Sequence, residues 1–166
     1  MCIRDSDHSI TFKPNISVIT NISPDHLDRY DEDFDLYTQS KYSIVKNQKP
    51  NDFFVYNNDC NVTKKIFSRI QIKSKSISFS TKQNSGLKHS IYVNNKNIIS
   101  SINKEKFMLS TDKIQIKGIH NIQNSMAAIS VAQILKISNQ KIKESLKTFK
   151  SIPHRLEHFL TIHKVK

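Results

Sequence analysis

Three residues that can transfer protons or bind metals stand close together near the amino-terminal end of the sequence. Asp25, His26 and Asp28 follow a short apolar run and the pair Ser23-Pro24, where a strand would end. Carboxylate and imidazole groups in such a loop can hold a divalent cation, and oxygen ligands suit Mg²⁺. The same spacing also fits a polar turn whose aspartates cap a helix. The residues alone leave both interpretations open.

Lys41 is the next candidate, because it stands in the middle of an apolar helical stripe. The helix is expected over residues 34–48, and its stripe consists of Phe34, Tyr37, Ile44 and Val45. A lysine in this position can extend its ammonium past the edge of the core into water. Alternatively, burial favours the neutral amine, which can add CO₂ and become a carbamate, a carboxylate-like metal ligand. Composition does not choose between these interpretations.

Two amides and one guanidinium complete the candidate residues. Asn121 and Asn124 are three apart, on one face of the first turn of an expected helix. Two amides there suit recognition of a nucleobase edge, although Asn121 could equally cap the helix. Arg155 follows Pro153 at a candidate domain junction, where it could clamp a phosphate or a ribose or lie on the surface.

The elements that must position these residues alternate between short apolar runs and helical stretches. This pattern predicts an α/β fold in which part of a mostly parallel sheet, with flanking helices, is followed by a small antiparallel β patch. We expect strands at residues 16–21, 53–56, 76–79, 106–109, 113–116 and 158–165, and a hairpin over 90–100. Further helices are expected at residues 62–70 and 140–149 and in the run that follows Gly118-Ile119-His120-Asn121 and ends at Lys136.

Composition excludes several kinds of protein. The 166 residues include only two glycines, Gly86 and Gly118, which are far apart. The sequence therefore contains neither of the Gly-rich phosphate-binding motifs, G-x-x-x-x-G-K-[ST] and G-x-G-x-x-G. Cys2 and Cys60 form neither a metal-ligand spacing nor a disulfide framework, which indicates a reducing cytosol. No apolar run approaches the ~18 residues that span a bilayer, and no signal peptide is visible.

The formal net charge of +12 is unevenly distributed. Residues 1–60 hold six Lys or Arg against ten Asp or Glu, whereas residues 61–166 hold 20 against four. A basic half can bind nucleic acid or a polyanionic small ligand. Because the lysines stand singly among Ile, Asn and Ser, we interpret most of them as a solvated surface. A small basic nucleic-acid-binding module is therefore kept as the alternative from another functional class.

Four segments in one order resemble the Mur ligase family, the ATP-dependent amide-forming ligases of peptidoglycan precursor synthesis. They are SPDHLDRY, Lys41 fifteen residues after His26, GIHNIQNSMAA and IPHRLE. The resemblance covers about residues 15–157. Because Arg29-Tyr30 follows the Asp-His-Leu-Asp run, this motif is most similar to that of the family members that add D-glutamate. Another ligase of the superfamily, such as a folate polyglutamylating enzyme, is the nearer alternative.

The resemblance implies a role for each candidate. His26 would coordinate Mg²⁺, the carbamylated Lys41 would support the metal as the catalytic lysine, and Asn121, Asn124 and Arg155 would bind ATP. ATP would phosphorylate the carboxylate of UDP-N-acetylmuramoyl-L-alanine, and the amine of D-glutamate would then displace phosphate. The resemblance also implies a cytoplasmic monomer that binds neither nucleic acid nor a membrane.

The sequence also departs from the family pattern. The Gly-rich phosphate loop, a metal-sharing carboxylate, the UDP-binding domain and most of the C-terminal domain are missing. We expect residues 1–6 to be a non-native junction and residues 7–150 to be the C-terminal part of the ATP-binding central domain. Residues 151–166 would be a linker and the first strand of the next domain. We predict that such a fragment is inactive alone.

Overall fold

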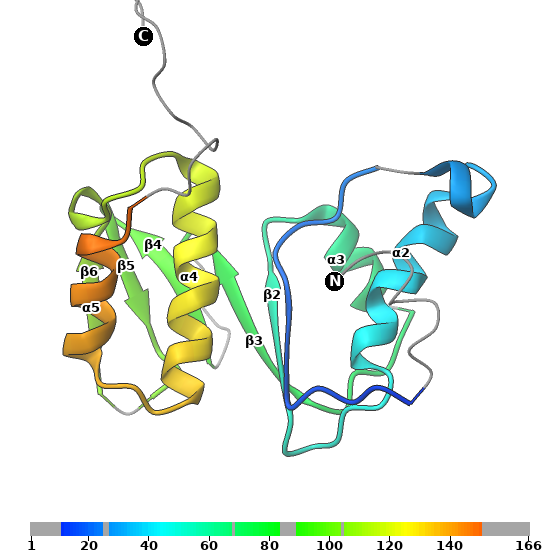
Figure 1. Cartoon of the computed structure of the whole chain (residues 1–166), viewed down its shortest axis with the longest axis horizontal. Helices are drawn as coiled ribbons and strands as arrows, with labels where there is room; N and C mark the ends of the chain where they lie inside the picture. Colours follow the sequence, from blue (N-terminus) through cyan, green and yellow to red (C-terminus); the bar gives the residue numbers. More distant parts are fainter. Residues whose placement is uncertain (1–10, 25–26, 68, 84–88, 104, 151–166) are drawn as a thin grey trace, which may run out of the picture.

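The computed structural model describes residues 11–24, 27–67, 69–83, 89–103 and 105–150 (Figure 1). Its centre is one six-stranded sheet in which the strands follow one another in chain order. The strands are β1 (Ile16–Ile19), β2 (Phe53–Asn57), β3 (Lys75–Ser80), β4 (Ser90–Asn94), β5 (Asn97–Ser100) and β6 (Phe107–Ser110). The first four strands pair in parallel, and β4, β5 and β6 pair antiparallel. The predicted antiparallel patch is thus the continuation of the parallel sheet.

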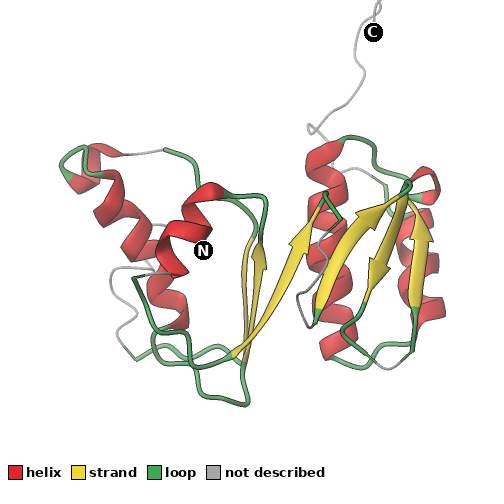
Figure 2. Cartoon of the chain, turned by 180° about the vertical axis from the view of Figure 1, so that it is seen from behind, coloured by secondary structure: helices red, strands yellow, loops and turns green. Residues whose placement is uncertain are grey.

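Helices lie on both faces of the sheet (Figures 1 and 2). They are α2 (Phe34–Tyr42), α3 (Asn61–Phe67), α4 (Ile119–Ile134) and α5 (Asn139–Thr148), with 3₁₀ turns η1 (Leu27–Tyr30), η2 (Ser43–Val45) and η3 (Thr111–Lys113). The crossovers from β1 to β2 and from β2 to β3 contain α2 and α3. Short β-branched and aromatic runs separated by helices produce this arrangement, because parallel neighbours require a crossover.

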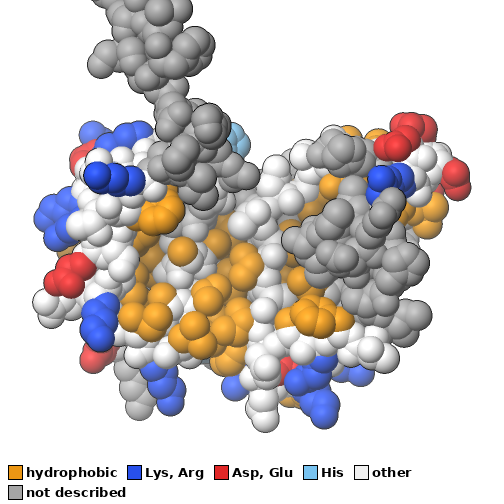
Figure 3. Space-filling view, viewed as in Figure 1, with side chains coloured by type: hydrophobic (Ala, Val, Ile, Leu, Met, Phe, Trp, Pro, Cys, Tyr) orange, Lys and Arg blue, Asp and Glu red, His pale blue; other side chains and the backbone are white. Residues whose placement is uncertain are grey.

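Two apolar cores hold these layers together. One core lies on the α4 side and contains Phe79, Ile91, Met126 and Ile129, all fully buried. The other lies on the α2 and α3 side, where the rings of Phe54, Tyr56 and Phe67 all contact one another. Figure 3 shows apolar side chains gathered along the middle of the face that carries α4.

The first helix is shorter than predicted. It ends at Tyr42 and tightens into η2, whereas the prediction extended it through Gln48. Gln48 leaves the helix because its buried amide donates to the carbonyls of Pro14 and Phe53, at 3.1 and 2.9 Å, and accepts from two serine hydroxyls. The tertiary hydrogen bonds of Gln48 therefore replace the last turn of the expected helix.

The predicted strand at residues 113–116 is wrong. The Ser110 hydroxyl accepts the Asp112 backbone N–H and starts η3, which turns the chain away from β6. Gln115 then donates its backbone N–H to Leu146 of α5 at 3.1 Å. Ile114, one of the apolar residues whose alternation predicted a strand, is instead buried in the core between the sheet and the helices.

The other predicted strands and helices that fall on described residues are present, with ends shifted by a few residues. The expected strand at residues 158–165 lies outside the described residues. Within the described ranges, no helix has both the length and the apolar character needed to cross a membrane.

Candidate functional site

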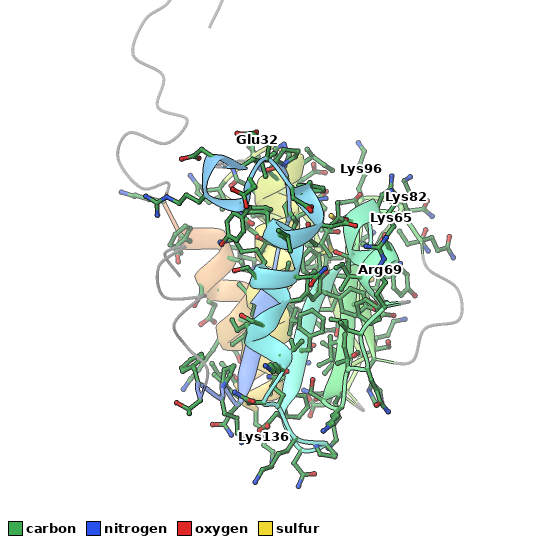
Figure 4. The ribbon with its side chains drawn as sticks, turned by 90° about the vertical axis from the view of Figure 1, so that its right-hand side faces the viewer. Glu32, Lys65, Arg69, Lys82, Lys96 and Lys136 are labelled. Carbon is green, nitrogen blue, oxygen red and sulfur yellow. The ribbon has the colours of Figure 1, made fainter. Side chains whose placement is uncertain are left out.

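The candidate site lies where β1, β2 and β3 end, at Ile19, Asn57 and Ser80, and we call this the carboxyl edge. The three strands point in the same direction (Figure 2), and α4 begins at the end of the molecule toward which they point (Figure 1). Figure 4 shows Glu32 at this end and Lys136, which follows α4, at the opposite end. In open α/β sheets, ligands bind in the crevice beyond the carboxyl ends of the strands.

Asp59 connects the ends of β2 and β3 at this edge. Its carboxylate accepts the Ser80 hydroxyl at 2.6 Å and both the backbone N–H and the hydroxyl of Thr81 at 2.7 Å. The turn that presents Asp59 is closed by the Asn57 side chain, which accepts the Asp59 N–H at 2.9 Å. Partial burial raises the pKa of Asp59, but the hydrogen bonds from Ser80, Thr81 and Gln123 outweigh burial and hold this pKa below its usual value.

Cys60 connects the ends of β1 and β2 in the same way. Its thiol donates to the Ile22 carbonyl at 3.9 Å, just before the loop that carries the predicted Asp-His-Leu-Asp run. Partial burial raises the pKa of Cys60, whereas hydrogen bonding with the Ile22 and Thr63 backbone lowers it, and the net direction is downward. Side chains that follow β2 therefore join all three strand ends of the carboxyl edge.

The first two turns of α4 present the two predicted asparagines. Asn124 is exposed and Asn121 is half-buried, and the Asn121 amide donates to the Lys117 carbonyl at 2.7 Å. The alternative that Asn121 caps the helix is wrong. The residue that precedes the helix is Gly118, whose φ of 101° is open to glycine but rarely to other residues.

Lys41 lies in α2 on the same face as Tyr37. It is half-buried, and its ammonium lies 5.2 Å from the centre of the Tyr37 ring. Tyr37 packs edge-on against Tyr30 of η1, with ring centres 5.5 Å apart. The Lys41 ammonium therefore lies beside a pair of packed tyrosine rings.

Three predicted site residues, Asp25, His26 and Arg155, lie outside the described residues. Asp28 is exposed in η1. Among the residues that the structure describes, no group of three or more His, Cys, Asp or Glu side chains could hold a metal ion. The described part of the chain thus does not assemble a metal centre by itself.

Sequence reasoning missed Asp59, Ser80 and Thr81. Asn57-Asn58-Asp59 was predicted only as a turn, and a polar turn after a buried strand at a ligand-binding edge is the one local signal that could have selected Asp59. Its hydroxyl partners lie 21 and 22 residues further along the chain. Only the register of β2 with β3 brings them to it.

The sheet, the helices on both faces and the polar carboxyl edge define an open α/β domain of the ligand-binding kind. A sequence model of the Mur ligase middle domain matches residues 3–132. The chain belongs to the Mur ligase family.

Relatives in this family carry a more specific name. The chain is 40% identical over 155 residues to the UDP-N-acetylmuramoylalanine–D-glutamate ligase of Christiangramia forsetii, a match that covers 93% of this chain and 34% of the relative. It is 41% identical over 147 residues to the ligase of the same name from Listeria monocytogenes serotype 4b, covering 89% of this chain and 30% of the relative. The chain therefore spans about a third of the length of the curated relatives it matches.

Solved structures share the fold. MurF from Acinetobacter baumannii superposes with a TM-score of 0.67 at 18% identity, over 90% of this chain and 32% of that one. A pseudomurein peptide ligase type C from Methanothermus fervidus gives a TM-score of 0.61 at 25% identity, over 93% of this chain and 37% of that one. The predicted α/β fold class with its antiparallel patch is confirmed.

Proposed function

We propose that this chain is part of the central, ATP-binding domain of a ligase that joins D-glutamate to UDP-N-acetylmuramoyl-L-alanine. The observation that carries the proposal is the identity of 40% and 41%, over about nine-tenths of this chain, to ligases of that name. In the proposed division, residues 7–150 belong to the central domain and residues 151–166 lead into the next one.

The carboxyl edge supports a nucleotide site in this ligase. Asn121 and Asn124 offer amide donors and acceptors at the start of α4, which suits the edge of an adenine. Arg155 would bind the ribose or the phosphates. In the proposed reaction, ATP phosphorylates the substrate carboxylate to an acyl phosphate. The amine of D-glutamate then attacks that carbonyl, forms the amide bond and releases phosphate.

The proposed metal ligands are His26 and the carbamylated Lys41. Lys41 is half-buried on α2 beside the Tyr37 ring, and its carbamate, formed by addition of CO₂ to the amine, would be a carboxylate-like ligand. Because the described residues alone do not assemble a Mg²⁺ site, we assign no step of the reaction to the ion. The contribution of the described residues is to hold the nucleotide beside the three strand ends.

The test begins with the coding sequence on both sides of this chain. If the reading frame continues upstream into a strand, a G-x-x-x-x-G-K-[ST] loop and a helix, the uninterrupted protein is expressed and assayed. We expect phosphate release from ATP that requires both UDP-N-acetylmuramoyl-L-alanine and D-glutamate.

Each other result has a definite meaning. Release with a different amino acid, or with a folate and L-glutamate, would assign the chain to another branch of the superfamily. A frame that stops upstream without a phosphate loop, or a complete protein that never releases phosphate, would contradict the ligase proposal.

A further inference from the structure

The segment that joins β6 to α4 is fixed to the core just before the helix begins. It consists of residues 111–118, and we call it the β6–α4 connector (Figure 1). Ile114, in its middle, is buried in the core. The backbone N–H of the next residue, Gln115, donates to the Leu146 carbonyl of α5 at 3.1 Å. The connector therefore supplies a fixed point four residues before the helix.

Lys117 ties the end of the connector to this fixed point. Its ammonium donates to the carbonyl of Asp112 at 2.8 Å and to that of Ile114 at 2.7 Å. These carbonyls lie in η3 and directly after it, where a lysine can satisfy the last acceptors of a helical turn. Both hydrogen bonds come from a charged donor, which strengthens them. The Lys117 side chain thus closes the connector on itself.

The backbone of the same residue holds the first of the two predicted asparagines. The Lys117 carbonyl accepts the side-chain amide of Asn121 at 2.7 Å. Because a carbonyl can only accept, the Asn121 nitrogen and not its oxygen must face Lys117. The oxygen is then the atom that Asn121 can offer to a ligand, as an acceptor. Lys117 therefore connects η3, through its ammonium, with Asn121, through its carbonyl.

The residue between Lys117 and α4 does not fix the start of the helix. Gly118 has no side chain that could accept the leading N–H groups of α4. Its φ of 101° belongs to a region that glycine enters freely, and glycine is also the residue that leaves such a conformation most easily. The contacts of Lys117 are therefore the ones that hold this junction in place.

We propose that Lys117 is a positioning residue of the nucleotide site, which fixes the connector and thereby sets which atom Asn121 presents to the nucleobase. The inference rests on the proposed function, in which Asn121 faces the adenine of ATP. Adenine carries an amino group that a carbonyl oxygen accepts, whereas the base of inosine triphosphate (ITP) carries an oxygen at that place. An Asn121 held in this way favours ATP over ITP. Lys117 acts through Asn121 and not through a contact with the phosphates.

Lys113 provides a matched control in the same connector. It lies in η3 and, like Lys117, is exposed. Lys113→Met and Lys117→Met change the net charge equally, so a general attraction of the ATP phosphates predicts similar effects for both. Lys117→Arg keeps a cationic N–H donor, and we expect it to restore most of what Lys117→Met loses.

The kinetic experiment compares these variants in the complete ligase of the uninterrupted reading frame. We expect Lys117→Met to raise the KM for ATP about fivefold, with the KM values for ITP and D-glutamate and the kcat unchanged. Lys113→Met should behave as the wild type. An equal rise in KM for ATP and ITP, or equal effects of the two methionine variants, would overturn the role of Lys117. A wild-type ligase with the same KM for ATP and ITP would overturn the orientation assigned to Asn121.

Amide hydrogen exchange tests the holding role without any activity, and it is measured on the chain itself. The Ile122 N–H makes the first hydrogen bond of α4, to the Gly118 carbonyl at 3.0 Å, so residues 122–125 report on the start of the helix. We expect faster exchange there in Lys117→Met and wild-type exchange in Lys113→Met, and unchanged exchange in Lys117→Met would overturn the proposal. A complete protein without ligase activity would instead overturn the proposed function, and the exchange result would still decide whether Lys117 holds the start of α4.

Discussion

Asp52 and Asp59 stand at opposite ends of β2, and each carboxylate accepts hydrogen bonds from segments that the strand must meet. Asp52 accepts from the Lys49 backbone and the Asn15 amide and pairs with the Lys13 ammonium at 3.1 Å. Asp59 accepts from Ser80 and Thr81. β2, an inner strand of the parallel part of the sheet, is therefore fixed at both ends by an ionised group.

These two carboxylates predict how stability depends on pH. The backbone hydrogen bond from Lys49 is the largest influence on Asp52, and the pKa values of both Asp52 and Asp59 lie below the usual 3.8. A carboxyl group whose pKa is lower in the folded state than in the unfolded state stabilises the fold fully at a pH above its unfolded-state pKa. This stabilisation is lost as the pH falls through the folded-state pKa. We expect stability to fall steeply below about pH 4, and less steeply in Asp52→Asn or Asp59→Asn.

Urea unfolding of the chain at a series of pH values from neutral to about pH 3 measures this slope. The two single variants and the double variant are compared with the wild type, and the double variant should show the flattest profile. Parallel profiles for all four proteins would show that neither carboxylate binds its proton more weakly in the folded state.

The sequence predicted the parts of the fold that local pattern determines. Short apolar runs became β1, β2 and β3, and the helical spacing of apolar residues became α4 and α5. The predicted strand over residues 113–116 was wrong, because alternation of apolar and polar residues indicates burial of one side of the segment but not that a neighbouring strand pairs with it. Ile114 is buried as expected, but by α4 and α5 and not by strand pairing.

Sequence reasoning could select candidate residues only where they are close in sequence. Asn121 and Asn124 were predicted because helical spacing places them near each other, and Lys41 because a cation is unusual on an apolar stripe; their roles stay predictions. Asp59 was not predicted, because its partners Ser80 and Thr81 are brought to it by the register of β2 with β3.

Gln48 is predicted to be the most sensitive polar residue of the amino-terminal half. Its amide connects Ser17 and Ser74, at 3.2 and 2.8 Å, with the carbonyls of Pro14 and Phe53. Gln48→Leu would keep the volume but leave these buried groups without their Gln48 partner, so we expect a loss of about 3–5 kcal/mol. Gln39→Leu, at an exposed position of α2, should change stability by less than about 0.5 kcal/mol.

Urea denaturation monitored by circular dichroism gives both values. Equal, small effects of the two substitutions would show that water replaces the hydrogen bonds of Gln48 without loss.

Lys41 is predicted to matter for activity far more than for stability. Its described interaction is the contact with the Tyr37 ring, and Lys143 makes a comparable contact with Phe107 at 5.4 Å. Such contacts contribute about 0.5–1 kcal/mol at partly exposed sites. Lys41→Ala and Lys143→Ala should therefore lower stability by similar small amounts.

Only Lys41→Ala should also lower the ligase activity of the complete protein, by about 10–100-fold or more, as expected when a group that supports a metal is lost. Thermal unfolding and the phosphate-release assay separate the two effects. Similar activity in both variants would remove Lys41 from the proposed site.

The two ends of α4 are predicted to respond in opposite directions to exchanges that involve glycine. Gly118 precedes the helix with φ 101° and ψ 152°, a region that only glycine enters without strain, although a Cβ there would meet no atom within 4 Å. Gly118→Ala should therefore cost about 1–3 kcal/mol through backbone strain alone. Lys136 ends the helix with φ 59°, in the left-handed conformation where glycine is favoured.

At this carboxyl end, the Lys136 and Ile137 N–H groups bond to the Gln133 and Ala132 carbonyls at 3.1 and 3.0 Å, as in a Schellman motif. Lys136→Gly keeps these bonds and removes the strain of a Cβ, so we expect a gain of about 1 kcal/mol. Chemical denaturation of both variants tests the pair. If Gly118→Ala left the free energy of unfolding unchanged, the backbone before α4 could adopt a conformation that accepts a Cβ. The helix would then not require glycine at this position.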